Sequence, residues 1–135
     1  MSSDNHQESF IRKYIFSTDH KWIGIQYGVT SMVFLLFGFI LMMIMRYQLA
    51  YNTSTGLEKD LISPDMYNAL GAMHGTIMVF LGVVPMVVGA FGNYLVPLQI
   101  GAPDMAFPKL NMTSYWAYFV GGVIMLASFF VPDQL

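Results

Sequence analysis

The chain has 135 residues, of which 56% are hydrophobic and only 10% are charged. Soluble domains carry about a quarter charged residues, so this composition argues against a soluble domain and indicates a membrane protein. The lack of cysteine excludes disulfides, thiolate zinc sites and iron–sulfur clusters. A net charge of −2 without a dense basic cluster offers no surface for nucleic acid.

Long uncharged stretches divide the chain. A helix needs about 20 apolar residues to cross ~30 Å of hydrocarbon, and three stretches meet that length. The prediction is an all-α membrane protein with an internal tail (1–22), a first transmembrane helix (23–45), an external loop (46–66), a second helix (67–96), an internal loop (97–109), a third helix (110–131) and a final segment (132–135). Pro97, Gly101 and Pro103 are expected to break the helical backbone in the internal loop.

Basic residues are spread unequally between the two sides of the predicted membrane. Four precede the first helix or lie between the second and third, against two in the external loop region, which places the N-terminus inside. They are Arg12, Lys13, Lys21 and Lys109, against Arg46 and Lys59. Asp19 and His20 are expected only to mark the start of the first helix.

His74 is the one ionisable residue well inside a predicted span. Such residues are costly in a membrane and are usually functional. A neutral imidazole can ligate haem iron in a helix bundle, or it can form an interhelical hydrogen bond, and the spacing leaves both open. Small residues recur beside it, and they fit either close helix packing or a flat macrocycle against the helix. This stripe comprises Gly71, Gly75, Met78 and Gly82.

Two further residues have a functional and a plain interpretation. Arg46 ends the first span on the external side, where it is either an interfacial anchor or a donor to a buried ligand near His74. Asp104 lies among prolines and apolar residues in the internal loop, with Asn93 and Asn111 on either side. It is either an ordinary loop acid or an acid that feeds protons into the membrane.

Four runs of residues resemble subunit I of the haem–copper oxidases, of the proton-pumping cytochrome c oxidase type. The order and spacing agree from Ser17 to Trp116. The runs are Ser17-Thr18-Asp19-His20-Lys21 with Ile23-Gly24, Met73-His74-Gly75-Thr76-Ile77-Met78, Gly92-Asn93-Tyr94-Leu95-Val96-Pro97-Leu98 and Ile100-Gly101-Ala102-Pro103-Asp104-Met105-Ala106-Phe107-Pro108.

The resemblance implies a role for each candidate residue. His74 is then an axial ligand of the low-spin haem, of haem a type, and Arg46 hydrogen-bonds a peripheral substituent of that haem. Asp104 matches the acid at the entrance of the D proton pathway, with Asn93 and Asn111 as the amides near its mouth. Gln48 stands where many members carry an acid of an outer cation site, so that site is not expected here.

The family's subunit has about twelve spans, so the chain resembles its N-terminal part, which would not reduce oxygen alone. The resemblance implies a high-spin haem and copper ligated by residues outside this stretch, and partner subunits II and III. It also implies O2 and cytochrome c as reactants, and a bacterial plasma membrane or mitochondrial inner membrane. Two alternatives stay open: a quinol-oxidising member of the family, or a stand-alone three-span haem-binding or packing subunit without enzymatic activity.

Overall fold

The computed structural model describes residues 10–51 and 61–131, and within these ranges every regular element is helical. After a short π-helix, η1 (Ile11–Ile15), the first long helix is α1 (His20–Ala50). The second long helix is continuous and consists of α2 (Pro64–Thr76), η3 (Ile77–Val83), η4 (Pro85–Phe91) and α3 (Gly92–Ile100). The third is α4 (Pro108–Ala127), which ends in η5 (Ser128–Phe130).

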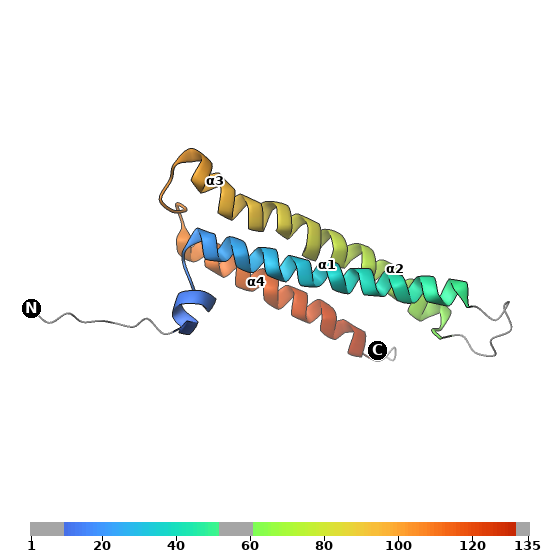
Figure 1. The fold of residues 1–135 in the computed structure, drawn as a ribbon. Coiled ribbons are helices and arrows are strands. Elements are labelled where there is room, and N and C mark those ends of the chain that lie inside the picture. Colours follow the sequence, from blue (N-terminus) through green and yellow to red (C-terminus); the bar gives the residue numbers. More distant parts are fainter. Residues whose placement is uncertain (1–9, 52–60, 132–135) are drawn as a thin grey trace, which may run out of the picture.

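Three of these helices are long and apolar enough to cross a membrane: His20–Ala50, Pro64–Ile100 and Pro108–Phe130. This confirms the prediction of an all-α membrane protein with three spans in this stretch. Figure 1 shows α1 and the second helix side by side in opposite directions, with α4 returning along α1. The start of α1, the turn after α3 and the start of α4 therefore lie at one end of the bundle.

The helix ends follow from local chemistry. Asp19 caps α1, because its Oδ1 accepts a hydrogen bond from the Lys21 amide at 3.1 Å. The Ser63 hydroxyl accepts from the Met66 amide at 3.2 Å and caps α2. Gly101 ends α3 in the left-handed conformation, with φ at 72°, which glycine adopts without a steric penalty.

The second helix runs through Pro97, which the sequence analysis expected to break it. Pro97 has no amide hydrogen to donate to the Asn93 carbonyl four residues earlier. The ring of His20, from α1, donates instead: its Nδ1 lies 2.9 Å from the Asn93 oxygen. Because a neighbouring helix supplies the missing donor, the backbone stays helical as far as Ile100.

A second proline in the same helix is accommodated in the same way. Pro85 cannot donate to the Leu81 carbonyl, and the hydroxyl of Tyr118, from α4, donates to that oxygen at 2.7 Å. The turns on either side of Pro85 are widened into the π-helices η3 and η4, a common local adjustment where a helix ladder is interrupted. Each proline therefore ties the second helix to one of its neighbours.

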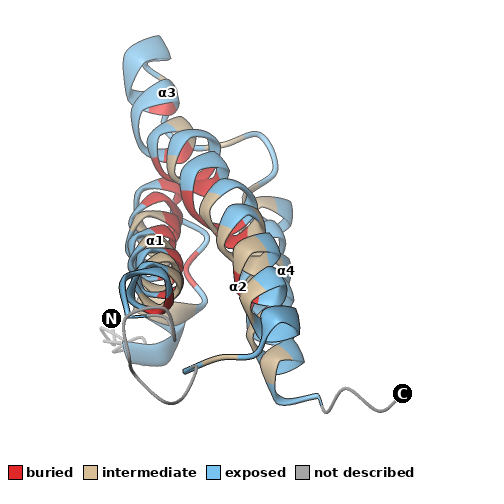
Figure 2. Ribbon diagram, turned by 90° about the vertical axis from the view of Figure 1, so that its right-hand side faces the viewer, coloured by how far each residue is buried: buried red, intermediate tan, exposed pale blue. Residues whose placement is uncertain are grey.

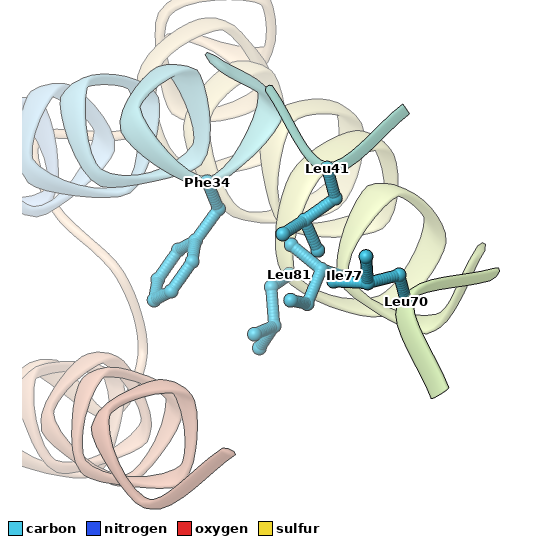
Figure 3. Close-up of a cluster of buried hydrophobic side chains, with 5 residues drawn as sticks. All are labelled: Phe34, Leu41, Leu70, Ile77 and Leu81. Carbon is cyan, nitrogen blue, oxygen red and sulfur yellow. The ribbon is translucent and has the colours of Figure 1, made fainter. Parts of the chain in front are cut away.

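The core lies mainly between α1 and the second helix. In Figure 2 the buried positions gather on their facing sides, while most of α4 is exposed. Figure 3 shows one buried cluster, in which Phe34 extends from α1 toward α4. Its members are Phe34, Leu41, Leu70, Ile77 and Leu81. Large apolar side chains cover the outer faces of the helices, and such faces suit lipid or further helices.

Candidate functional site

His74 lies in α2, and its ring faces α1. Its Nδ1 is 2.8 Å from the backbone oxygen of Gly38. A carbonyl oxygen only accepts hydrogen bonds, so Nδ1 carries the proton, and in the neutral imidazole Nε2 keeps its lone pair. Metal-ligating histidines characteristically donate their other ring N–H to a carboxylate or a carbonyl. The geometry therefore leaves one nitrogen of His74 chemically suited to ligate iron.

The glycines beside His74 do not all serve the same purpose. A Cβ added to Gly82 would lie 2.5 Å from Cδ2 of Leu35, and one added to Gly71 would lie 3.3 Å from Cε of Met45. These two glycines allow close packing on α1, as the plainer interpretation expected. Gly75 differs, because a Cβ there would have no neighbour within 4 Å. The surface beside His74 is thus open, and a flat ligand could lie against it.

Arg46 is exposed near the end of α1, eight residues beyond Gly38. At ~1.5 Å per residue it lies about 12 Å farther along the helix axis than the carbonyl that His74 contacts. Within residues 10–51 and 61–131, no hydrogen bond or ion pair engages its guanidinium. The structure places Arg46 toward the same end of the bundle as His74, without bringing their side chains together.

Asn93 and Asn111, by contrast, are in direct contact across the turn between α3 and α4. The Nδ2 of Asn111 donates to the Oδ1 of Asn93 at 2.7 Å, and Asn93 is buried, with 7% of its surface exposed. The Nδ2 of Asn93 donates to the Gly89 carbonyl at 2.6 Å. Together with the bond from His20, these contacts hold the Asn93 side chain and backbone in one position.

Polar groups continue from this amide pair toward the interior of the bundle. The hydroxyl of Ser114 donates to the Asn111 carbonyl at 2.7 Å and lies 3.1 Å from the Tyr27 hydroxyl. These residues line a groove of about 560 Å³, which also contains Met105 of the turn. A run of polar groups thus leads from the turn into a span, where unpaired polar groups would be costly.

Asp104 is exposed in the turn, where its Oδ1 accepts from the Met105 amide at 2.7 Å. In the described part of the chain no hydrogen bond joins it to Asn93 or Asn111. Asp104 therefore lies next to a residue of the groove, while the two amides lie within the groove itself. An exposed carboxylate next to a groove that contains these polar side chains can exchange protons with water.

Three contributors to this region were not predicted from the sequence. Ser114 and Tyr27 carried no signal, because single hydroxyl-bearing residues are common in spans. The third, His20, is 2% exposed and donates to Asn93. A histidine at the start of one helix and a proline within the next helix could together have suggested this hydrogen bond.

One other side chain, Gln48, bears on metal binding. Gln48 is buried, and its Oε1 accepts from the amides of Leu61 and Ile62 at 2.9 and 3.3 Å. It ties the segment just before α2 to α1, which is a structural role. Among the described residues, no three His, Cys, Asp or Glu side chains come together as a metal site. A haem iron held by His74 would take its remaining ligands from the macrocycle and from residues outside this stretch.

Residues 22–135 match the model of the family described as "Cytochrome C and Quinol oxidase polypeptide I". A protein from Thermostichus vulcanus named "Cytochrome c oxidase subunit 1" is 51% identical over 116 residues, which is 86% of this chain and 20% of that protein. One of the same name from Synechocystis sp. is 42% identical over 131 residues, which is 97% of this chain and 23% of that protein.

The chain belongs to this family of oxidase subunit I proteins, and it is an integral membrane protein. This confirms the resemblance drawn from the sequence motifs. The chain spans about a fifth of the length of the curated relatives it matches.

Proposed function

We propose that the chain forms part of subunit I of a respiratory haem–copper terminal oxidase, within a bundle of about twelve helices. The complete complex, with subunits II and III, oxidises cytochrome c, reduces O2 to water and pumps protons. This stretch contributes one ligand of the low-spin haem, His74, and the entrance of the D pathway. The high-spin haem and the copper are held elsewhere in the subunit. The observation that carries the proposal is the hydrogen bond from His74 Nδ1 to the Gly38 carbonyl.

The residues of the chain fit a low-spin haem, of haem a type. The Gly38 carbonyl fixes the tautomer of His74 and makes Nε2 more basic, which would strengthen its bond to a haem iron. The missing side chain at Gly75 leaves room beside the imidazole. Arg46 is exposed farther along α1 and can donate to a peripheral oxygen of the macrocycle. The haem, when bound, supplies one-electron transfer; the protein supplies ligation and orientation.

Replacement of the ligand tests this part of the proposal. In the assembled oxidase, His74→Ala is expected to abolish the low-spin haem absorption band, because no other described side chain takes the place of its Nε2. The matched control is Thr76→Ala, since the Thr76 hydroxyl bonds only to the Ala72 carbonyl of its own helix. An unchanged band in His74→Ala would exclude the ligand role.

The second part of the proposal concerns proton uptake at the turn between α3 and α4. Asp104 is exposed, and the amide pair of Asn93 and Asn111 lies in the groove beside it. Amides can hold ordered water, and the hydroxyls of Ser114 and Tyr27 extend the polar route inward. In this scheme Asp104 collects protons from the internal solution, and the groove passes them along through water.

Asp104→Asn removes the titratable group with little change in size. It is expected to slow proton uptake and pumping while the haem absorption bands stay normal, because Asp104 and His74 lie near opposite ends of the second helix. Proton uptake is measured as alkalinisation of a lightly buffered medium during turnover. Turnover and pumping equal to those of the wild type would remove Asp104 from the pathway.

The proposed orientation places the N-terminus inside an energy-conserving membrane. Arg12, Lys13, Lys21 and Lys109 all lie at the end of the bundle that carries Asp104, in agreement with the positive-inside rule. Lys59, counted on the other side, falls outside the described residues. Proton uptake from the inside and haem toward the outside follow from this orientation.

The electron donor is the point at which the family divides. The family description covers both cytochrome c and quinol oxidases, while both relatives compared above are named for cytochrome c. Those names favour cytochrome c for this chain. Spectrophotometric assays of the purified complex with reduced cytochrome c and with a soluble quinol distinguish the two donors, and preferential quinol oxidation would assign the chain to the other branch.

A further inference from the structure

At the internal end of the bundle, a pocket lies where the segment before α1 meets the start of α4. Its volume is about 750 Å³, and it is separate from the groove beside Asp104. Three of its lining residues are cations and only one is an acid, so its formal charge is +2. They are Arg12, Lys13 and Lys109, with Asp19.

The positive charge of this pocket is not neutralised by the described part of the chain. Arg12, Lys13 and Lys109 are exposed, and no ion pair engages them within residues 10–51 and 61–131. The acid, Asp19, already accepts the Lys21 amide as the cap of α1. The start of α4 has no side-chain cap, so its first amides add partial positive charge beside Lys109.

The pocket is also held in shape. Gln26 of α1 donates through Nε2 to the carbonyls of Tyr14 and Ile15, at 2.8 and 3.0 Å. These bonds fix η1, and with it Arg12 and Lys13, against α1. Tyr14 packs edge-on against Trp22, with ring centroids 4.8 Å apart. Two of the three cations therefore sit on a segment that is tied to the bundle.

The remaining walls distinguish a lipid from a free anion. Ser17, Thr18 and Thr113 supply hydroxyls, whereas Phe16, Trp22 and Met112 supply apolar surface. The pocket lies where the spans α1 and α4 begin, which is the depth of lipid headgroups, and Trp is typical of that depth. An inorganic anion would gain nothing from the apolar wall, while a phospholipid would use both kinds of surface.

We propose that this pocket binds the headgroup of an anionic phospholipid, with its phosphate among Arg12, Lys13 and Lys109 and its acyl chains along the apolar side. Basic pockets between transmembrane helices on the cytoplasmic side commonly take such headgroups. The site is independent of the haem ligand and of the proton entrance.

The test uses the intact complex in detergent, titrated with phosphatidylglycerol or phosphatidylcholine and analysed by native mass spectrometry. The wild type is expected to retain phosphatidylglycerol in preference to phosphatidylcholine. Each basic residue near an anionic surface contributes about fivefold in affinity. Lys109→Gln should therefore weaken phosphatidylglycerol binding about fivefold, and Arg12→Gln with Lys109→Gln about 25-fold.

Lys21→Gln is the matched control, because Lys21 is an exposed cation at the same end of the bundle but does not line the pocket. Its effect should stay below twofold, because Lys21 lies outside the pocket and its charge would not contact the headgroup. Equal retention of phosphatidylglycerol by the double variant and the wild type would overturn the proposal. Equal binding of the two lipids would also overturn it. Displacement of phosphatidylglycerol by equimolar inorganic phosphate would assign the pocket to free anions instead.

Discussion

The hydrogen bond from Tyr118 to the Leu81 carbonyl makes a measurable prediction about how α4 is attached. Tyr118→Phe removes one oxygen atom and keeps the ring that packs in the core. Pro85 offers no amide hydrogen to the Leu81 oxygen, so the variant removes the side-chain donor of this carbonyl, and it also removes the 3.4 Å contact of the same hydroxyl with buried Ser31. Such a loss costs about 1–3 kcal/mol, and Tyr118→Phe should lower the free energy of unfolding by that amount.

Tyr115→Phe provides a control in the same helix with the same chemical change. The Tyr115 hydroxyl pairs with the Thr30 hydroxyl at 3.0 Å, and no backbone carbonyl of the described residues accepts from it. When this partner is lost, Thr30 can turn to a carbonyl of its own helix. The cost should therefore stay below about 0.5–1 kcal/mol. Both variants are compared by SDS titration of the purified protein, with helicity followed by circular dichroism.

A double-mutant cycle with Pro85 isolates the cause. Pro85→Ala returns an amide hydrogen at the position that normally donates to Leu81, so Tyr118→Phe should cost much less in that background. The reasoning would be refuted if Tyr118→Phe were as mild as Tyr115→Phe. It would also be refuted if its cost were the same with alanine as with proline at position 85.

Three further predictions concern His20 and two glycines of the second helix. His20→Phe should cost about 1–3 kcal/mol in the SDS assay, because the carbonyl left free by Pro97 loses its donor, and Pro97→Ala should relieve part of that loss; equal costs in both backgrounds would contradict this account. Gly89→Ala should destabilise by about 1–3 kcal/mol, since the new Cβ would lie 2.5 Å from a rigid aromatic ring of α1. Gly75→Ala should not destabilise the helix but should lower haem content, measured from the pyridine haemochrome spectrum; normal haem content would show that Gly75 does not make room for haem.

The three spans could be predicted because the hydrocarbon core imposes a strong, local constraint. A charged residue is expensive there, so the charges themselves mark where spans begin and end. The same constraint singled out His74, the ionisable residue that a span keeps despite its cost. The order and spacing of the motifs then identified the family, since the matching runs occur at the family's spacing. The family model covers residues 22–135.

The helix limits near prolines could not be predicted, because they depend on donors from distant parts of the chain. Pro97 reads locally as a helix end, yet the helix continues because His20, 73 residues away in sequence, supplies the missing hydrogen bond. Pro85 is accommodated by Tyr118 in the same way. A local pattern reports which donor is lost, but only the packed helices show which side chain replaces it.

The polar residues of the candidate site were likewise predictable in part: their identity could be predicted from the sequence, but their contacts could not. The residue types identified His74, Asp104, Asn93 and Asn111 as candidates, because polar groups are costly in or beside an apolar span. Their pairing was decided by tertiary structure: the turn at Gly101 brings the two amides within 2.7 Å, while Asp104 stays exposed and makes no hydrogen bond to either amide within the described residues. Composition and charge are properties of the chain and can be read along it. Hydrogen-bond geometry between helices exists only once the helices have packed, and it gave His74 a fixed tautomer through a carbonyl of α1.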